Sequence, residues 1–232
     1  MVKLSAIQLN ATTSVSHNLQ VIEQQLDKLT GRYNVSDNGE DQVEHIVVLP
    51  ECCLFFGAND KAQLSLAQKS FTHNELQKKL SDLAQKFKVT LIGGTIPILT
   101  DDGNKFTNSS CIFNTNGTLL GRYDKMHLFD VTIADNKNNY RESRFTQAGE
   151  QACMVKTPVA NIGLTVCFDV RFPALFQTLT AMGADIITVP SAFTRVTGKA
   201  HWQTLLQARA IENQIYIVAA GQEGIHENGR ET

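Results

Sequence analysis

The sequence has little net charge and no long apolar run. Its 21 basic side chains stand against 23 acidic ones, which gives a formal charge of −2. Proteins that bind nucleic acid or anionic membranes usually carry a strong basic excess, so the composition argues against both kinds of partner. No stretch approaches the roughly 20 consecutive apolar residues that span a bilayer, and no export signal opens the chain. We therefore expect a cytoplasmic protein with a small-molecule partner.

The cysteines also lack the spacing that a disulfide framework or a zinc site requires. There are five, an odd number, and no two of them form a Cys-x-x-Cys pair. A structural zinc site or a set of paired cysteines is therefore not predicted, and free thiols suit a reducing compartment. We expect neither a metal nor an organic cofactor.

What the chain does have is the composition of an ordinary globular protein. Its 232 residues are 42% hydrophobic, which is enough to bury one sizeable core. No internal repeat, low-complexity segment or linker divides the chain. We expect one domain over residues 1–232.

Apolar patterning predicts strands that alternate with helices. The predicted strands cover residues 2–9, 46–49, 91–96, 162–166, 186–189 and 216–220. The predicted helices cover residues 15–29, 75–87, 173–182 and 200–213. Between residues 109 and 123, an Asn-Gly pair separates two short apolar stretches, which is typical of a β-hairpin. These patterns predict an α/β fold with mixed sheets and helices on the outside.

Three reactive side chains follow predicted strands. Cys167 directly follows the apolar stretch at residues 162–166, Glu51 follows the stretch at residues 46–49, and Lys125 comes just after the hairpin. Strand ends in α/β sheets commonly meet at a ligand site. A thiol there needs a base or a neighbouring cation to become reactive, and an ammonium group can stabilise an oxyanion.

Each of these residues also has an ordinary structural explanation. Cys167 can be a small buried hydrophobe, and Glu51 and Lys125 can be solvated surface groups. His127 and His201 are further candidates, because many thiol enzymes use a Cys–His pair. Spacing alone does not choose between a carboxylate and a histidine as the base.

The motifs around these residues resemble the nitrilase, or carbon–nitrogen hydrolase, superfamily. Leu-Pro-Glu at residues 49–51, Arg-Tyr-Asp-Lys-Met-His-Leu-Phe at 122–129 and Gly-Leu-Thr-Val-Cys-Phe-Asp-Val-Arg-Phe-Pro at 163–173 match its three catalytic blocks in order. The resemblance covers nearly the whole chain. It implies an αββα four-layer sandwich and subunits that pair as a homodimer or a higher homo-oligomer.

The resemblance also implies roles for the site residues. Glu51 is the general base, Lys125 stabilises the tetrahedral intermediate, and Cys167 forms a thioester acyl-enzyme. The backbone N–H of Phe168 completes the oxyanion hole. Glu142, in a segment similar to the one that carries the family's second active-site glutamate, positions Lys125 or relays protons.

The segments at residues 190–202, 206–213 and 218–222 resemble the deaminated glutathione amidase branch. That branch releases 2-oxoglutarate and cysteinylglycine, and its nearest alternative is the omega-amidase branch, which acts on 2-oxoglutaramate. Both substrates end in a 2-oxo acid, which requires a cation or hydrogen-bond donors. The candidates for this contact are Arg171, Arg195, Thr197 and His201.

Two further expectations concern the chain as a whole. The pattern of this branch continues with more strands after the segment that matches Gly229 to Thr232, so we expect a chain that is shortened at its C-terminus and lacks those strands. A shortened chain leaves open a function of another class, a binding protein with the nitrilase fold and no turnover. The presence of Glu51, Lys125 and Cys167 favours the enzyme.

Overall fold

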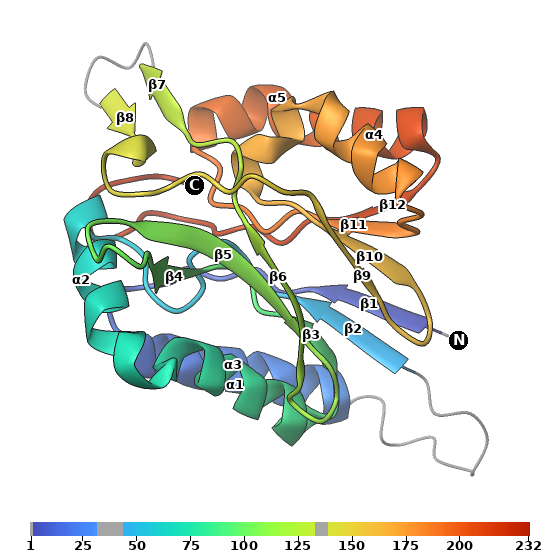
Figure 1. Ribbon diagram of the computed structural model, residues 1–232, viewed down its shortest axis with the longest axis horizontal. Helices are drawn as coiled ribbons and strands as arrows, with labels where there is room; N and C mark the ends of the chain where they lie inside the picture. Colours follow the sequence, from blue (N-terminus) through green and yellow to red (C-terminus); the bar gives the residue numbers. More distant parts are fainter. Residues whose placement is uncertain (1, 32–43, 133–138) are drawn as a thin grey trace.

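A computed structural model of the chain describes residues 2–31, 44–132 and 139–232. Two β-sheets face each other, with helices on both outer sides (Figure 1). This is the four-layer αββα arrangement that the sequence predicts. Within the described residues, no helix has the length and apolar character needed to cross a membrane.

The first sheet combines parallel and antiparallel strands. It contains β1 (Val2–Ala6), β2 (Glu44–Val48), β3 (Thr90–Ile92), β4 (Ile96–Leu99), β5 (Phe106–Phe113) and β6 (Leu119–Asp124). β1, β2 and β3 are parallel, whereas β5 is antiparallel to β3, β4 and β6. The β5–β6 pair is the hairpin that the Asn-Gly sequence predicts.

The second sheet has the order β12-β11-β10-β9. Its strands are β9 (Cys153–Lys156), β10 (Asn161–Leu164), β11 (Ile186–Thr188) and β12 (Tyr216–Val218). β10, β11 and β12 are parallel, and β9 is antiparallel to β10. A separate antiparallel pair joins β7 (Asp130–Thr132) and β8 (Asn139–Arg141).

Helices cover the outer face of each sheet. α1 (Val15–Gly31) and α3 (Glu75–Phe87) lie below the first sheet in Figure 1, and α4 (Pro173–Ala181) and α5 (Arg195–Asn213) lie above the second. α2 (Asp60–Ser70) packs beside β4. Short 3₁₀ helices complete the chain: η2 (Phe71–His73), η3 (Glu142–Arg144) and η4 (Cys167–Arg171).

β2 explains why the core lies in two layers. Ile46 and Val48 belong to the apolar cluster between the two sheets. Val47 and Leu49 belong to a second cluster, which includes the buried side chains of α1 and α3. Because side chains alternate along a strand, a strand covered on both faces needs a continuous apolar run. Residues 46–49 are buried on both faces, and this places the end of β2 deep inside the molecule.

Candidate active site

Glu51 lies at the end of β2, where both sheets meet. Its Oε1 accepts hydrogen bonds from Lys125 Nζ at 3.0 Å and from Asn108 Nδ2 at 2.9 Å, and its Oε2 accepts one from the Ala192 backbone N–H at 2.9 Å. Its backbone carbonyl accepts a hydrogen bond from Gln222. Lys125 and Asn108 come from the first sheet, and Ala192 follows β11 of the second, so the carboxylate joins the two halves of the fold.

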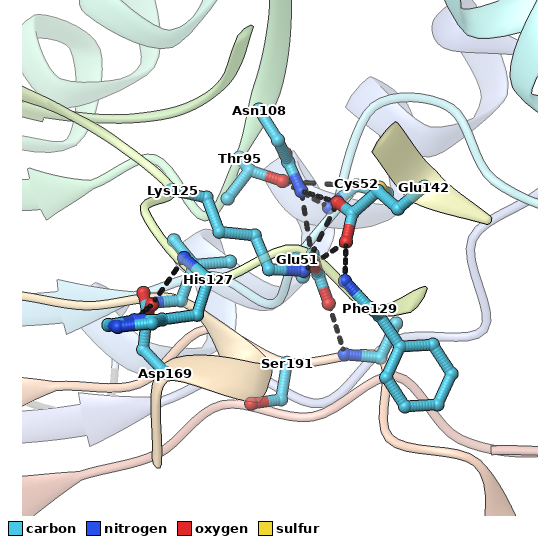
Figure 2. A network of polar contacts seen from close by, with 12 residues as sticks. Glu51, Cys52, Thr95, Asn108, Lys125, His127, Phe129, Glu142, Asp169 and Ser191 are labelled. Carbon is cyan, nitrogen blue, oxygen red and sulfur yellow. Dashed lines mark hydrogen bonds and ion pairs between the residues drawn. The ribbon is translucent and has the colours of Figure 1, made fainter. Parts of the chain in front are cut away.

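Lys125 is held between two carboxylates. It directly follows β6, and its Nζ lies 3.0 Å from Glu51 and 2.9 Å from Glu142 Oε2 (Figure 2). Only 2% of the Lys125 side chain is exposed, so the ammonium group exchanges its water shell for these two partners. Burial would lower the pKa of Lys125, but Glu142 and Glu51 together raise it well above the usual range. The side chain is therefore a fixed cation.

Glu142 is oriented by the loop around it. It opens η3, and its Oε2 also accepts the Phe129 backbone N–H at 2.7 Å. Asn108 contacts both Glu51 and Glu142, which ties the two carboxylates together. Asn108 is not among the residues selected from the sequence, because an asparagine within a buried strand carries no motif.

Cys167 occupies a strained turn. It is the first residue of η4, and its φ of +48° lies in the left-handed region, which residues other than glycine rarely adopt. Its backbone N–H donates to the Pro190 carbonyl, and its thiol donates to the Glu51 carboxylate. A sharp strand-to-helix turn of this kind directs a nucleophile away from the sheet and into a cavity.

Burial and the negative charge of Glu51 raise the pKa of the Cys167 thiol, although Lys125 opposes this change. The thiol is therefore protonated at neutral pH. Burial would also raise the pKa of Glu51, but Lys125, the Cys167 hydrogen bond and Arg230 outweigh it and lower the pKa. The pair thus consists of a neutral thiol beside a carboxylate that is free to accept its proton.

These side chains line one cavity of about 260 Å³. Glu51, Lys125, Glu142 and Cys167 all contribute to its wall, together with Phe168 and Thr197 from the predicted set. Among the described residues, no group of three or more His, Cys, Asp or Glu side chains is arranged to hold a metal ion. The cavity is large enough to bind a small organic substrate and carries the groups to react with it.

Three of the candidate substrate contacts lie outside this cavity. Arg171 reaches His201, with 3.2 Å between Nη2 and Nδ1, and Arg195 pairs with Glu231 at 3.0 Å. None of Arg171, Arg195 and His201 lines the cavity. The cavity contains instead two arginines that the sequence did not select, Arg141 and Arg230.

His127 is also engaged away from the reactive cluster. Its Nδ1 lies 2.7 Å from Asp169, and its ring stacks on Phe172 with 3.6 Å between centroids. Figure 2 shows the His127–Asp169 pair apart from the Lys125–Glu51–Glu142 cluster. Since His201 is held by Arg171, the residue beside the thiol is the carboxylate of Glu51.

Asp169 connects the two chain segments that carry Lys125 and Cys167. It is fully buried and accepts hydrogen bonds from Tyr123 Oη at 2.8 Å and from the Val166 N–H at 2.8 Å. The His127 N–H donates to it as well. Tyr123 and His127 flank Lys125, and Val166 precedes Cys167, so one carboxylate fixes the distance between the cation and the thiol.

Known proteins of one family match nearly the whole chain. The carbon-nitrogen hydrolase family model matches residues 3–232. A deaminated glutathione amidase from Yersinia enterocolitica is 41% identical over 99% of this chain and 76% of its own length. The human omega-amidase is 34% identical over 87% of this chain and 71% of its own length.

Solved structures of proteins from this family have the same fold. The Caenorhabditis elegans NitFhit protein superposes with a TM-score of 0.85 at 34% identity, covering all of this chain and 55% of that fusion protein. A nitrilase-superfamily protein from Saccharomyces cerevisiae gives a TM-score of 0.81 at 28% identity over all of this chain and 84% of its own length. The chain belongs to the carbon–nitrogen hydrolase family. Within that family it is an amidase, an enzyme that hydrolyses carbon–nitrogen bonds in small amides other than peptides.

Proposed function

We propose that the chain hydrolyses deaminated glutathione to 2-oxoglutarate and cysteinylglycine through a thioester on Cys167. The observation that carries this proposal is the meeting of Cys167, Glu51, Lys125 and Glu142 at one cavity. Similarity to the Yersinia enterocolitica deaminated glutathione amidase supports the choice of substrate. These four residues are the proposed catalytic set.

The first step is attack of the Cys167 sulfur on the amide carbonyl carbon. Because burial and Glu51 raise its pKa, the thiol is not ionised in the resting enzyme. Its proton therefore passes to Glu51 as the C–S bond forms. Glu51 acts as a general base that is already hydrogen-bonded to the group it deprotonates.

Charge then develops on the former carbonyl oxygen. Lys125 Nζ, held by Glu51 and Glu142, is the proposed cation that stabilises this oxyanion, and the Phe168 backbone N–H is the second donor. Preorganised donors are effective here because they need no reorientation during the reaction. Glu142 keeps the ammonium group in place and is a positioning residue in this scheme.

The tetrahedral intermediate collapses when the C–N bond breaks. Glu51 returns its proton to the departing nitrogen, so that the amine leaves and the acyl group stays on Cys167 as a thioester. A water molecule then loses a proton to Glu51 and attacks the thioester carbonyl. Release of the carboxylic acid restores the thiol, and the overall reaction consumes one water.

An omega-amidase activity is the second candidate. Similarity to the human omega-amidase favours it, and both substrates present the same acyl group to Cys167. Steady-state hydrolysis of deaminated glutathione and 2-oxoglutaramate by the wild-type chain and by Cys167→Ala separates the two. The proposal expects faster release of cysteinylglycine and no activity in the variant. Preference for 2-oxoglutaramate would move the assignment to the omega-amidases.

We also propose that residues 1–232 form one domain and that the protein is a cytoplasmic homodimer or higher homo-oligomer. Two exposed apolar residues near the outer face of the second sheet support self-association, Ile211 at 76% and Tyr216 at 72% exposure. Ile211 belongs to α5 and Tyr216 to β12, two elements in contact, and exposed apolar side chains that gather on one side of a protein often mark an interface.

A further inference from the structure

Arg230 is a cation in the cavity that the proposed mechanism does not use. It lines the same cavity as Cys167 and Glu51. The ion pairs formed within residues 2–31, 44–132 and 139–232 all involve other residues, so no carboxylate of the described chain neutralises it. An arginine without an ion-pair partner at the wall of an enzyme cavity is a candidate for binding an anionic ligand.

The Arg230 side chain is fixed in position but has unused donors. Its guanidinium lies 5.2 Å from the ring centroids of Phe56 and Tyr140, and its Nη2 donates to the Ala192 carbonyl. Its Nε is buried and has no hydrogen-bond partner in the described part of the chain. A guanidinium group has five N–H donors, so this one is far from saturated.

The backbone around Arg230 is equally well held. Its N–H donates to Asn228 Oδ1 at 3.0 Å, and its carbonyl accepts the His226 N–H at 2.9 Å. The residue therefore sits in a tight, internally bonded turn. A cation held in advance on such a turn loses little conformational freedom when a ligand binds.

Charge balance in the cavity gives a reason for this arrangement. Glu51 and Glu142 contribute two negative charges and Lys125 one positive charge, so the reactive cluster is negative by one and repels an anionic substrate. Arg230 offsets this negative charge, and Arg141, which also lines the cavity, adds a second positive group. Arg230 is also close enough to Glu51 to lower the pKa of that carboxyl group, which places its charge within reach of the reacting centre.

We infer that Arg230 forms a carboxylate-binding subsite that holds the acyl-side carboxylate of the substrate. This subsite selects amides of short dicarboxylic acids over neutral amides. The rings of Phe56 and Tyr140 provide apolar walls beside it, which strengthen the ion pair by excluding water. The inference rests on the proposed function, because it names the part of that substrate which Arg230 contacts.

The test compares two substrates that differ in one charge: deaminated glutathione, and the same compound methylated at its acyl-side carboxylate. Arg230→Gln should lower kcat/KM for the acid by about tenfold or more, mainly through KM, and change it for the ester by less than about threefold. Arg230→Lys should recover part of the loss. Arg144→Gln is the matched control, because Arg144 is an exposed arginine outside the cavity, and it should change neither rate.

Two results would overturn the inference. One is an equal loss on acid and ester, which would mean that Arg230 acts through Ala192 and Glu51. The other is a wild-type enzyme that hydrolyses the ester as well as the acid, which would leave the proposed amidase function intact.

A binding measurement separates the inference from the proposed function. The affinity of the wild-type chain for 2-oxoglutarate, measured by calorimetry, should fall about tenfold in Arg230→Gln and stay unchanged in Arg144→Gln. Such a fall in an enzyme without turnover would support the subsite and contradict the proposed reaction. An affinity that does not depend on Arg230 would contradict the subsite whatever the turnover.

Discussion

At the scale of single residues, the central feature is an ammonium group that two carboxylates hold in place. Glu51 has a proposed second task as base, whereas Glu142 contacts Lys125, Asn108 and the Phe129 backbone and has no proposed part in proton transfer. The two glutamates are therefore expected to respond differently when each is changed. Glu51 should be essential for both proton transfers, and Glu142 should matter through the position of Lys125.

Replacement of Glu142 by Gln tests this division. The variant keeps the shape of the side chain but removes one of the two charges that hold Lys125, so kcat should fall by about 10²-fold with a smaller change in KM. Steady-state kinetics gives both constants. Glu150→Gln, an exposed glutamate a few residues along the chain, is the control. A variant with wild-type kcat would contradict the role of Glu142.

The resting protonation states predict the pH dependence of acylation. The pKa of Glu51 is lowered from 4.5, so the base is ionised above that pH and activity should decline only when the pH falls below it. The pKa of Cys167 is raised from 9.0, and the thiol stays protonated beyond that pH. Single-turnover acylation rates should therefore be level between these limits. A rising limb with a midpoint near 8 to 9 would indicate a preformed thiolate and contradict the mechanism.

Asp169 should contribute to stability as well as to geometry. Asp169→Asn keeps the size of the side chain but leaves buried hydrogen bonds from Tyr123, His127 and Val166 poorly matched. We expect a loss of about 1–3 kcal/mol in the free energy of unfolding, measured with urea. Asp82→Asn removes an exposed helical ion pair and should cost less than about 0.5 kcal/mol. Equal losses of unfolding free energy in the two variants would show that the hydrogen bonds of Asp169 do not stabilise the fold.

Glu51, Lys125 and Cys167, which the sequence selects as candidates, line one cavity in the structure. Their position after strands did not separate them from buried or solvated residues, and the resemblance of the surrounding motifs to the nitrilase superfamily did. Arg171 and Arg195, which were candidate substrate contacts, do not line the cavity, since the direction of a side chain on a short helix or at a helix start depends on tertiary packing. Arg230 could not be predicted as a cavity residue, because it lies in a loop with no periodic pattern.

At the scale of elements, prediction depended on how regular the apolar pattern was. α3 begins and ends where the sequence predicts, because Leu76, Leu80 and Leu83 form one buried stripe. α2 was missed, since few of its side chains are buried and its apolar pattern is weak. α5 begins at Arg195, five residues before the predicted start, because Val196, Thr197 and Gly198 have low helix propensity and packing overrides it.

The turn before β4 supports the end of β2 and gives a further prediction. Gly94 has a φ of +57°, and a Cβ at this position would lie 2.0 Å from the Pro50 carbonyl oxygen. Gly94→Ala should therefore push against the segment that carries Glu51. We expect a loss of about 2–3 kcal/mol in the free energy of unfolding by urea denaturation.

Gly103 provides the control for this change. It also has a positive φ, +70°, but a Cβ there would meet nothing within 4 Å. Gly103→Ala isolates the cost of backbone strain from the cost of the collision with Pro50. Equal losses in the two variants would contradict the steric explanation.

At the scale of the whole molecule, the site exists only where the two sheets face each other. The first sheet provides Glu51 and Lys125, and the second provides Cys167 and the Ala192 N–H that fixes Glu51. The alternation of strands and helices predicted an α/β fold with mixed sheets and outer helices, and the face-to-face pairing of two sheets came from the resemblance to the nitrilase superfamily. The alternation alone could not give this pairing, because it includes contacts between distant residues, such as that of Ala192 with Glu51.

Self-association is a prediction at this scale. The proposed homodimer should elute with twice the 25.6 kDa mass of the chain in size-exclusion chromatography with light scattering. Ile211→Glu places a charge on the exposed end of α5 and should shift the mass to that of a monomer. Leu119→Glu, at an exposed position on the hairpin, is the control and should leave the mass unchanged. A dimer that tolerates Ile211→Glu would exclude this face as the interface.

The central claim is that the acyl group passes through a thioester on Cys167. The most direct measurement is rapid acid quenching of the wild-type chain during turnover of deaminated glutathione, followed by peptide mass spectrometry. The account predicts a 2-oxoglutaryl adduct on the peptide that contains Cys167, and no adduct in Cys167→Ala. An adduct on Cys52, Cys53, Cys111 or Cys153, or continued turnover by Cys167→Ala, would contradict it.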